Sequence, residues 1–299
     1  MKEGIVKMKK IKLLLLLLGI FALSGCNITK DSMEDINIYT TIYPIKYLVT
    51  SLYGEHSEVN SIYPSGIDTN EFKLSDKKLK EYANTDLFVF NSLDKERDYA
   101  VKMINYNKNL KVIDVSMGMN YENKIAELWL NPYNYLMMAQ NTKNGLLEYI
   151  TNPYLISNDE GTGIENKYEE LKYNISRLDA DMKEAISLAP YKTVVVDSDL
   201  FKYLEKYNLN VISLEENDKL NENIISEVKK LIRNGNIKYI YSSSNTTNET
   251  CQNLIDNYGV ELVTINTMES IDGNISNSNE NYITIMNNNL DLLNKELYK

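Results

Sequence analysis

The sequence predicts an α/β protein of two lobes, each with a mostly parallel sheet flanked by helices, joined by one long backbone helix. Two observations lead to this prediction. Short apolar runs alternate with amphipathic ones in both halves of the 299-residue chain, and an unbroken stretch with helical spacing separates the halves. A chain of this length can build two lobes of ordinary size. The expected boundaries are residues 36–150 for the N-terminal lobe, 151–189 for a linker that contains the long helix, and 190–299 for the C-terminal lobe.

The first half shows a regular β/α alternation. Pro44 sits at the first turn of one expected helix, and Ser75 is placed to cap another. Further helices are expected over 97–106 and 133–150, and residues 151–163 read as a loop. The expected strands are Ile36–Ile42, Glu58–Tyr63, Asp86–Asn91 and Lys111–Val115.

The long helix is expected over 164–188, ending before Pro190, because its apolar residues recur every three or four positions. A second β/α set follows it, and a last helix is expected over 280–297. Ligands of open parallel sheets sit beyond the carboxyl ends of the strands, so a site is expected in the loops that follow them. The strands of this second set are Thr193–Asp197, Asn210–Leu214, Ile237–Ser243 and Glu261–Ile265.

The N-terminus reads as a lipoprotein signal peptide, residues 1–25. Three lysines precede an apolar run that is too short to span a bilayer and ends at "LSGC", which resembles the lipobox of bacterial lipoproteins. Cys26 is therefore the expected lipidation site, residues 26–35 a tether, and the expected location extracytoplasmic. Removing residues 1–25 takes away five Lys and one Glu, so the formal charge changes from −10 to −14. Such an acidic body would be held at the cell membrane by its lipid anchor alone.

Composition and residue types argue against a nucleic-acid binder and against an enzyme that depends on histidine or cysteine. An acidic chain lacks the basic face of a nucleic-acid binder. The single histidine, His56, is expected as a solvated turn residue, and Cys251 is expected to fill a helix face. One His and one spare Cys cannot form a histidine-based triad or a Cys/His zinc cluster, and no phosphate-binding glycine motif follows an expected strand. An enzyme is not expected.

Four segments carry a family resemblance. The stretch from "TTIYPIKYLV" to "DLFVFNSL", then "ELWLNPYNYLMMAQN", "VVVDSDLFKYLEKYNL" and "NYITIMNNNLDLLNKEL", resemble the binding lipoproteins of zinc and manganese ABC importers. The likeness covers nearly all of residues 36–299. It implies a monomeric binding protein that serves an ABC permease.

The resemblance also implies a metal site with one ligand from each of four loops. In "GIDTNEF" the position of the family's first histidine is Asn70, and in "ELWL" the second position is Glu127. "SDLFKY" puts Ser198 at the third position. The fourth falls on Glu269 or, by another alignment, on Asn266; Glu269 is preferred because Ser-Ile follows it. The metal-ligand histidines are thus replaced by oxygen donors, which suit harder cations such as Mn²⁺ or Ca²⁺ better than zinc.

The expected function is capture of a solute by an extracytoplasmic binding lipoprotein, with a divalent cation of the Mn or Zn class as the expected ligand. Two interpretations of the cleft stay open: an altered, oxygen-lined metal site and a degenerate site that no longer binds metal. Two other functions would fit the same scaffold, namely binding of a non-metal small ligand and adhesion at the cell surface.

Overall fold

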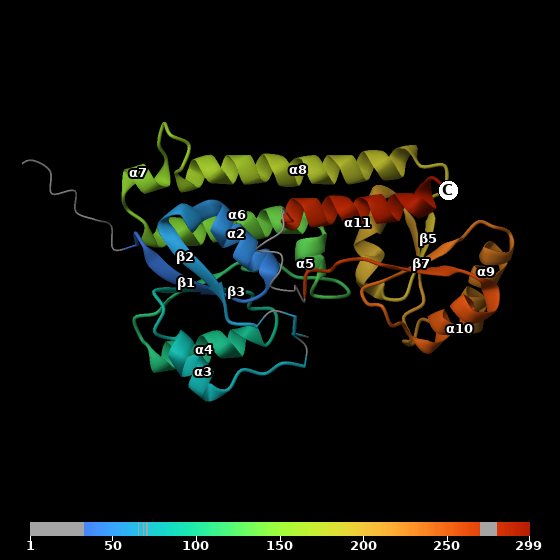
Figure 1. Cartoon of the computed structure of the whole chain (residues 1–299), viewed down its shortest axis with the longest axis horizontal. Coiled ribbons are helices and arrows are strands. Elements are labelled where there is room, and N and C mark those ends of the chain that lie inside the picture. The colour runs from blue at the N-terminus through green and yellow to red at the C-terminus, as the bar shows by residue number, and fades with distance from the viewer. Residues whose placement is uncertain (1–32, 65, 68, 70, 270–279) are drawn as a thin grey trace, which may run out of the picture.

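The computed structural model of the chain describes residues 33–64, 66, 67, 69, 71–269 and 280–299. Its two lobes each contain a four-stranded parallel sheet (Figure 1). The predicted fold class is confirmed. The long helix α8 (Ile164–Leu188) runs along both lobes, with the bounds that the apolar periodicity predicts.

The N-terminal sheet has the strand order β2-β1-β3-β4. Helices α3 and α4 lie on one side of it, and α2 and α6 lie on the other side, next to α8 (Figure 1). Ser75 caps α3 as predicted, accepting the Lys78 N–H at 3.3 Å. The elements are β1 (Ile36–Thr40), α2 (Tyr43–Tyr53), η1 (Gly54–His56), β2 (Ser57–Ser61), α3 (Asp76–Tyr82), β3 (Leu87–Phe90), α4 (Glu96–Tyr106), β4 (Lys111–Asp114), α5 (Glu127–Leu130) and α6 (Pro132–Tyr149).

The C-terminal sheet has the strand order β6-β5-β7-β8. The region expected as a loop contains one helical turn, α7 (Pro153–Ile156), capped by Asn152. The segment after β5 forms a 3₁₀ helix, η2 (Asp199–Tyr207). The other elements are β5 (Thr193–Val196), β6 (Asn210–Ser213), α9 (Glu222–Arg233), β7 (Tyr239–Ser242), α10 (Glu249–Tyr258), β8 (Glu261–Thr264) and α11 (Tyr282–Leu297).

The alternation of side chains along the strands divides the apolar interior into two clusters. Val194 and Val196 of β5 face a large cluster that continues through α8 and α11 into the N-terminal lobe. Val195, between them, faces a smaller cluster under α9 and α10. Met33, in the expected tether, is also fully buried in the large cluster.

The first turn of α11 is anchored in the N-terminal lobe. Tyr282 is fully buried there, and its ring stacks on Tyr135 of α6 with 3.8 Å between ring centroids. The Tyr282 hydroxyl donates to the carbonyl oxygen of Trp129 at 2.7 Å. The other end of α11 lies against the C-terminal sheet, where Tyr241 of β7 donates to the Leu292 carbonyl at 2.9 Å. Helix α11 is therefore a second rigid connection between the lobes, beside α8.

We expect Tyr282→Ala to lower the free energy of unfolding by about 3–5 kcal/mol, because it empties a fully buried ring site. Tyr282→Phe should cost about 1–3 kcal/mol, since only the hydrogen bond to the Trp129 carbonyl is lost. Tyr298→Phe is the matched control: its hydroxyl also donates to a carbonyl, but its side chain is 48% exposed, so water can replace the bond. Urea unfolding measures all three. An equal cost for Tyr282→Ala and Tyr298→Phe would contradict the anchoring role of α11.

Candidate functional site

The loops at the carboxyl ends of the two sheets meet between the lobes. In the loop after β4, the Lys124 ammonium forms an ion pair with Glu215 of the loop after β6, with 2.5 Å between Nζ and Oε1. The indole N–H of Trp129 in α5 donates to the Thr267 carbonyl, after β8, at 2.7 Å. This bond is buried, whereas the ion pair is partly exposed. The strand-end loops thus form one junction, as expected for a ligand site of this architecture.

Glu127 occupies the first position of α5 and is only 5% exposed. Its carboxylate accepts the Asn123 side-chain amide at 2.9 Å and the Glu122 backbone N–H at 3.3 Å. Tyr203 of η2 lies beside it: burial, and to a smaller extent the Glu127 charge, raise the pKa of this phenol. Glu127 is therefore an ionisable group held at the interface by its own loop.

Ser198 is the N-cap of η2, and its hydroxyl accepts the Leu200 N–H at 3.2 Å. The acidic residues on either side of it face different surroundings. One carboxylate oxygen of Asp197 is buried without a hydrogen-bond partner among the described residues, and burial raises the pKa of this group. Burial acts in the same direction on Asp199, but hydrogen bonds and charges from its neighbours, Lys202 among them, outweigh it and lower the pKa of Asp199.

The two candidates for the fourth position lie in the loop after β8. The Glu269 carboxylate accepts the Thr267 hydroxyl at 3.0 Å and is half-buried. The Asn266 side chain accepts the N–H of Met268 at 2.9 Å and so shapes the loop, in which Met268 has a φ of 60°. Asn266 thus has a structural role in turning the chain.

Three of the four predicted ligand positions lie on segments that contact one another. Glu127 is on α5, and Ser198 opens η2, whose Tyr203 lies near Glu127. The loop that carries Glu269 is hydrogen-bonded to α5 through the Trp129 indole. Asn70 lies outside the described residues. Among the residues that the structure describes, no group of three or more His, Cys, Asp or Glu side chains is placed to hold a metal ion. The predicted set contains only two residues of those types.

Helix α4 braces the loop that leads from β2 to α3. The Lys95 ammonium donates to the carbonyl oxygens of Thr69 and Phe72, and the Tyr99 hydroxyl accepts the Leu74 N–H at 3.4 Å. At the first position of α4, burial raises the pKa of Glu96 to about 8, and its carboxylate accepts the Asn91 N–H at 3.1 Å. No sequence pattern singles out these residues, because lysine and tyrosine at the start of an amphipathic helix do not point to a loop more than twenty positions away.

Comparison with known proteins identifies the family. The model of the family "zinc-uptake complex component A periplasmic" (ZnuA) matches residues 38–296, most of the chain. The chain belongs to the ZnuA family. The predicted resemblance to the binding proteins of metal importers is thereby confirmed.

Individual relatives of this ZnuA-family chain are distant. The zinc-binding lipoprotein AdcA of Streptococcus pneumoniae is 23% identical over 312 residues, covering 96% of this chain and 60% of AdcA. This chain thus spans about three fifths of that relative. The high-affinity zinc uptake system protein ZnuA of Bacillus subtilis is 22% identical over 320 residues, covering 93% and 97% of the two chains. The crystal structure of the metal-dependent lipoprotein YcdH from Bacillus subtilis superposes with a TM-score of 0.71 at 18% identity, over 89% of this chain and 100% of that chain, and so shows the shared fold.

Two smaller expectations for this ZnuA-family chain have different outcomes. Cys251 is free and fully buried in α10, as predicted, and burial raises the pKa of its thiol to about 12. His56 lies in the turn η1 and is partly exposed, as expected, but its ring is not fully solvated. Its ring lies 5.5 Å from the Tyr53 ring, and its Nε2 atom is buried without a hydrogen-bond partner among the described residues. A turn beside a helix end can bury one edge of a ring while the rest of the side chain stays partly exposed.

We expect Trp129→Phe to loosen the loop after β8, because the Thr267 carbonyl loses its buried indole donor. Amide hydrogen exchange over residues 265–269 should speed up by about tenfold or more, which corresponds to the 1–3 kcal/mol cost of a broken buried hydrogen bond. Lys124→Met is the control, since an exposed ion pair contributes about 0–1 kcal/mol. Unchanged exchange in Trp129→Phe would mean that this bond does not hold the loop.

Proposed function

We propose that this chain is an extracytoplasmic solute-binding lipoprotein that captures a divalent cation between its lobes and delivers it to an ABC permease as a monomer. The observation that carries the proposal is the family match over residues 38–296, together with strand-end loops from both lobes that meet at one junction. The names of the relatives refer to zinc binding and zinc uptake, which favours a cation over a non-metal ligand or an adhesive role.

The proposed ligand positions are Asn70, Glu127, Ser198 and Glu269. His56 is the only histidine of the chain, and it precedes β2, so it lies at the opposite edge of the N-terminal sheet from the strand-end loops. No imidazole is therefore available for the cation. Two carboxylates and two neutral oxygen donors should hold a hard cation, with water completing its shell, and should hold zinc more weakly than a histidine site does.

In this proposal the residues around the ligands set the geometry. Asn123 and the backbone of Glu122 orient the Glu127 carboxylate, and the hydroxyl of Thr267 orients that of Glu269. The Glu127 Oε1 atom accepts one of these bonds, which leaves it a further lone pair for the cation, whereas Oε2 accepts the backbone N–H groups of both Glu122 and Asn123. Ser198 would have to combine its capping bond with ligation, which makes it the weakest of the four donors.

The proposal is tested by replacing the oxygen donors with imidazoles. The triple variant Asn70→His, Glu127→His, Ser198→His should bind zinc at least about 100-fold more tightly than the native chain, because zinc gains most from nitrogen donors. Titration calorimetry with zinc, manganese and calcium compares the two proteins. His56→Ala is the control and should leave the native affinities unchanged. Tight zinc binding by the native chain that depends on residues outside the four loops would show that the site is misplaced.

We also propose that Cys26 carries the lipid anchor. Cys26 lies outside the described residues, and none of the helices in the described part of the chain has the length and apolar character needed to cross a bilayer. Cys26→Ser should therefore prevent lipid attachment and leave the protein unprocessed or released into the medium. Cell fractionation and the mass of the extracted protein measure this. Normal processing and full membrane retention of Cys26→Ser would refute the anchor.

A further inference from the structure

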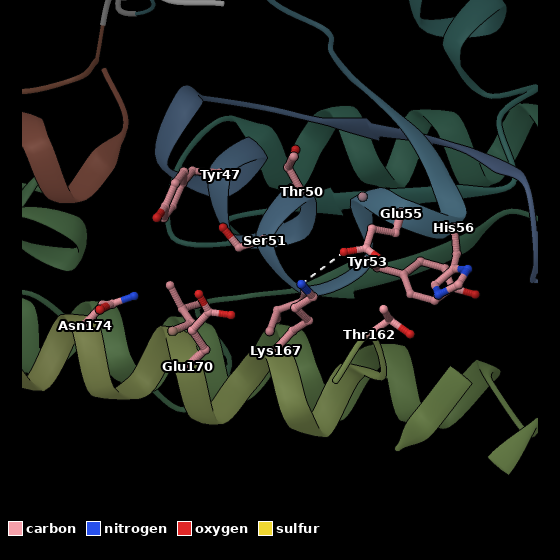
Figure 2. A pocket seen from close by; sticks show the side chains of 13 residues that line it. Tyr47, Thr50, Ser51, Tyr53, Glu55, His56, Thr162, Lys167, Glu170 and Asn174 are labelled. Carbon is pink, nitrogen blue, oxygen red and sulfur yellow. Dashed lines mark ion pairs between the residues drawn. The ribbon is translucent and has the colours of Figure 1, made fainter. Parts of the chain in front are cut away.

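A polar groove of about 260 Å³ lies between α2 with η1 and the first half of α8, away from the strand-end loops. Figure 2 shows side chains from both elements converging on it, with Lys167 reaching from α8 toward Glu55 of η1. Their ion pair measures 3.0 Å between Nζ and Oε1. Neither the family match nor the cation proposal gives this groove a function.

One end of the groove is suited to an anion. The Lys167 ammonium uses one of its three donors on Glu55, which leaves two for another acceptor. The buried Nε2 atom of His56 has no hydrogen-bond partner among the described residues. Thr162, just before the N-cap of α8, lines the same end of the groove (Figure 2).

The other end is suited to an ammonium group. Glu170, one turn further along α8, makes no ion pair or hydrogen bond within the described part of the chain, and its carboxylate lines the groove (Figure 2). It lies close to Tyr47: burial, and more weakly the Glu170 charge, raise the pKa of this phenol, so the ring stays neutral. A carboxylate beside an aromatic ring, with the Ser51 hydroxyl nearby, is a common arrangement for binding an ammonium.

The two ends are close enough for one small ligand to occupy both. Lys167 and Glu170 are three residues apart on a helix, a rise of about 4.5 Å. A phosphodiester of ethanolamine carries its phosphate and its ammonium only two carbons apart. Its net charge is zero, so the groove can bind it although the chain as a whole is acidic.

The start of the fold places this groove near the proposed anchor. Tyr53 of the groove donates its hydroxyl to the Met33 carbonyl at 2.6 Å, and the Asp35 N–H donates to the His56 carbonyl at 2.8 Å. Seven residue steps separate Cys26 from Met33, and a fully extended chain of that length reaches at most about 25 Å. We propose that the α2–α8 groove binds the ethanolamine phosphate headgroup of a zwitterionic phospholipid in the membrane that holds the chain, an inference that rests on the lipid anchor proposed above.

The first experiment titrates glycerophosphoethanolamine into residues 27–299, which include every residue that the structure describes, and follows binding by calorimetry. Lys167→Met and Glu170→Gln should each weaken binding by at least about tenfold. The matched controls Lys172→Met and Glu169→Gln change the same residue types in an exposed ion pair on the same helix and should have no effect. Binding that is absent in the native chain, or unchanged in both groove variants, would overturn the proposal. Equally tight binding of inorganic phosphate, ethanolamine or glycylglycine would overturn the assignment to an ethanolamine phosphodiester.

A second experiment identifies the source of the headgroup. Lipidated full-length protein is placed in vesicles of phosphatidylethanolamine with phosphatidylcholine, or of phosphatidylglycerol with phosphatidylcholine. Hydrogen exchange over 53–56 and 162–174 should be slower in the first kind of vesicle, and Lys167→Met should remove the difference. Equal exchange in both would overturn the lipid headgroup as occupant. Two checks separate a failure of this proposal from a failure of the proposed function. The groove variants should keep the native cation affinity, so a loss of headgroup binding alone leaves the cation function intact. A protein that carries no lipid would be recognised by its mass.

Discussion

The buried contact between Tyr282 and the N-terminal lobe fixes the relation between the two halves of the molecule. The Tyr282 hydroxyl donates a hydrogen bond to the Trp129 carbonyl, and the Trp129 indole N–H donates one to the Thr267 carbonyl. At the far end of the same helix, the fully buried Glu296 accepts the Lys238 and Tyr239 N–H groups of the C-terminal lobe at 3.0 and 2.9 Å. A hinge rotation between the lobes would have to break such bonds, at about 1–3 kcal/mol for each group left unsatisfied. Ligand entry is therefore expected to depend on movement of the strand-end loops.

Residues considered for the candidate site also make hydrogen bonds that hold the surrounding loops in place. Ser198 caps η2, Asn266 turns the loop after β8, and Glu127 braces the preceding segment through Asn123. These bonds keep the loops in shape when no ligand is present. Oxygen donors of this kind can serve both roles, because a carboxylate or hydroxyl oxygen has more than one lone pair. A site of imidazoles would bind zinc more strongly but would supply fewer acceptors to the surrounding N–H groups.

Much of the fold could be predicted because its signals are local. The apolar periodicity of α8 and the runs "LFVF" and "TVVV" show helix and strand within a few residues of their true ends. The position of α11 could not be predicted, because it depends on Tyr282 meeting Tyr135 almost 150 residues earlier. The same limit applies to the site. Motif spacing predicts Glu127 and Ser198 as candidates, but only the folded chain shows Tyr203 beside Glu127 and Lys95 on the loop after β2.

Trp129 is the only tryptophan of the chain, and it is 2% exposed at the junction of the two lobes. Indole emission depends on solvent exposure and on hydrogen bonding of the ring N–H, and it can be excited at wavelengths where tyrosine does not absorb. The intrinsic fluorescence of this protein therefore comes from one known position, whose ring is bonded to the loop that carries Glu269. Any cation or conformational change that shifts this loop should alter the emission spectrum. The molecule thus contains an optical reporter of the junction between its lobes, which needs no attached dye.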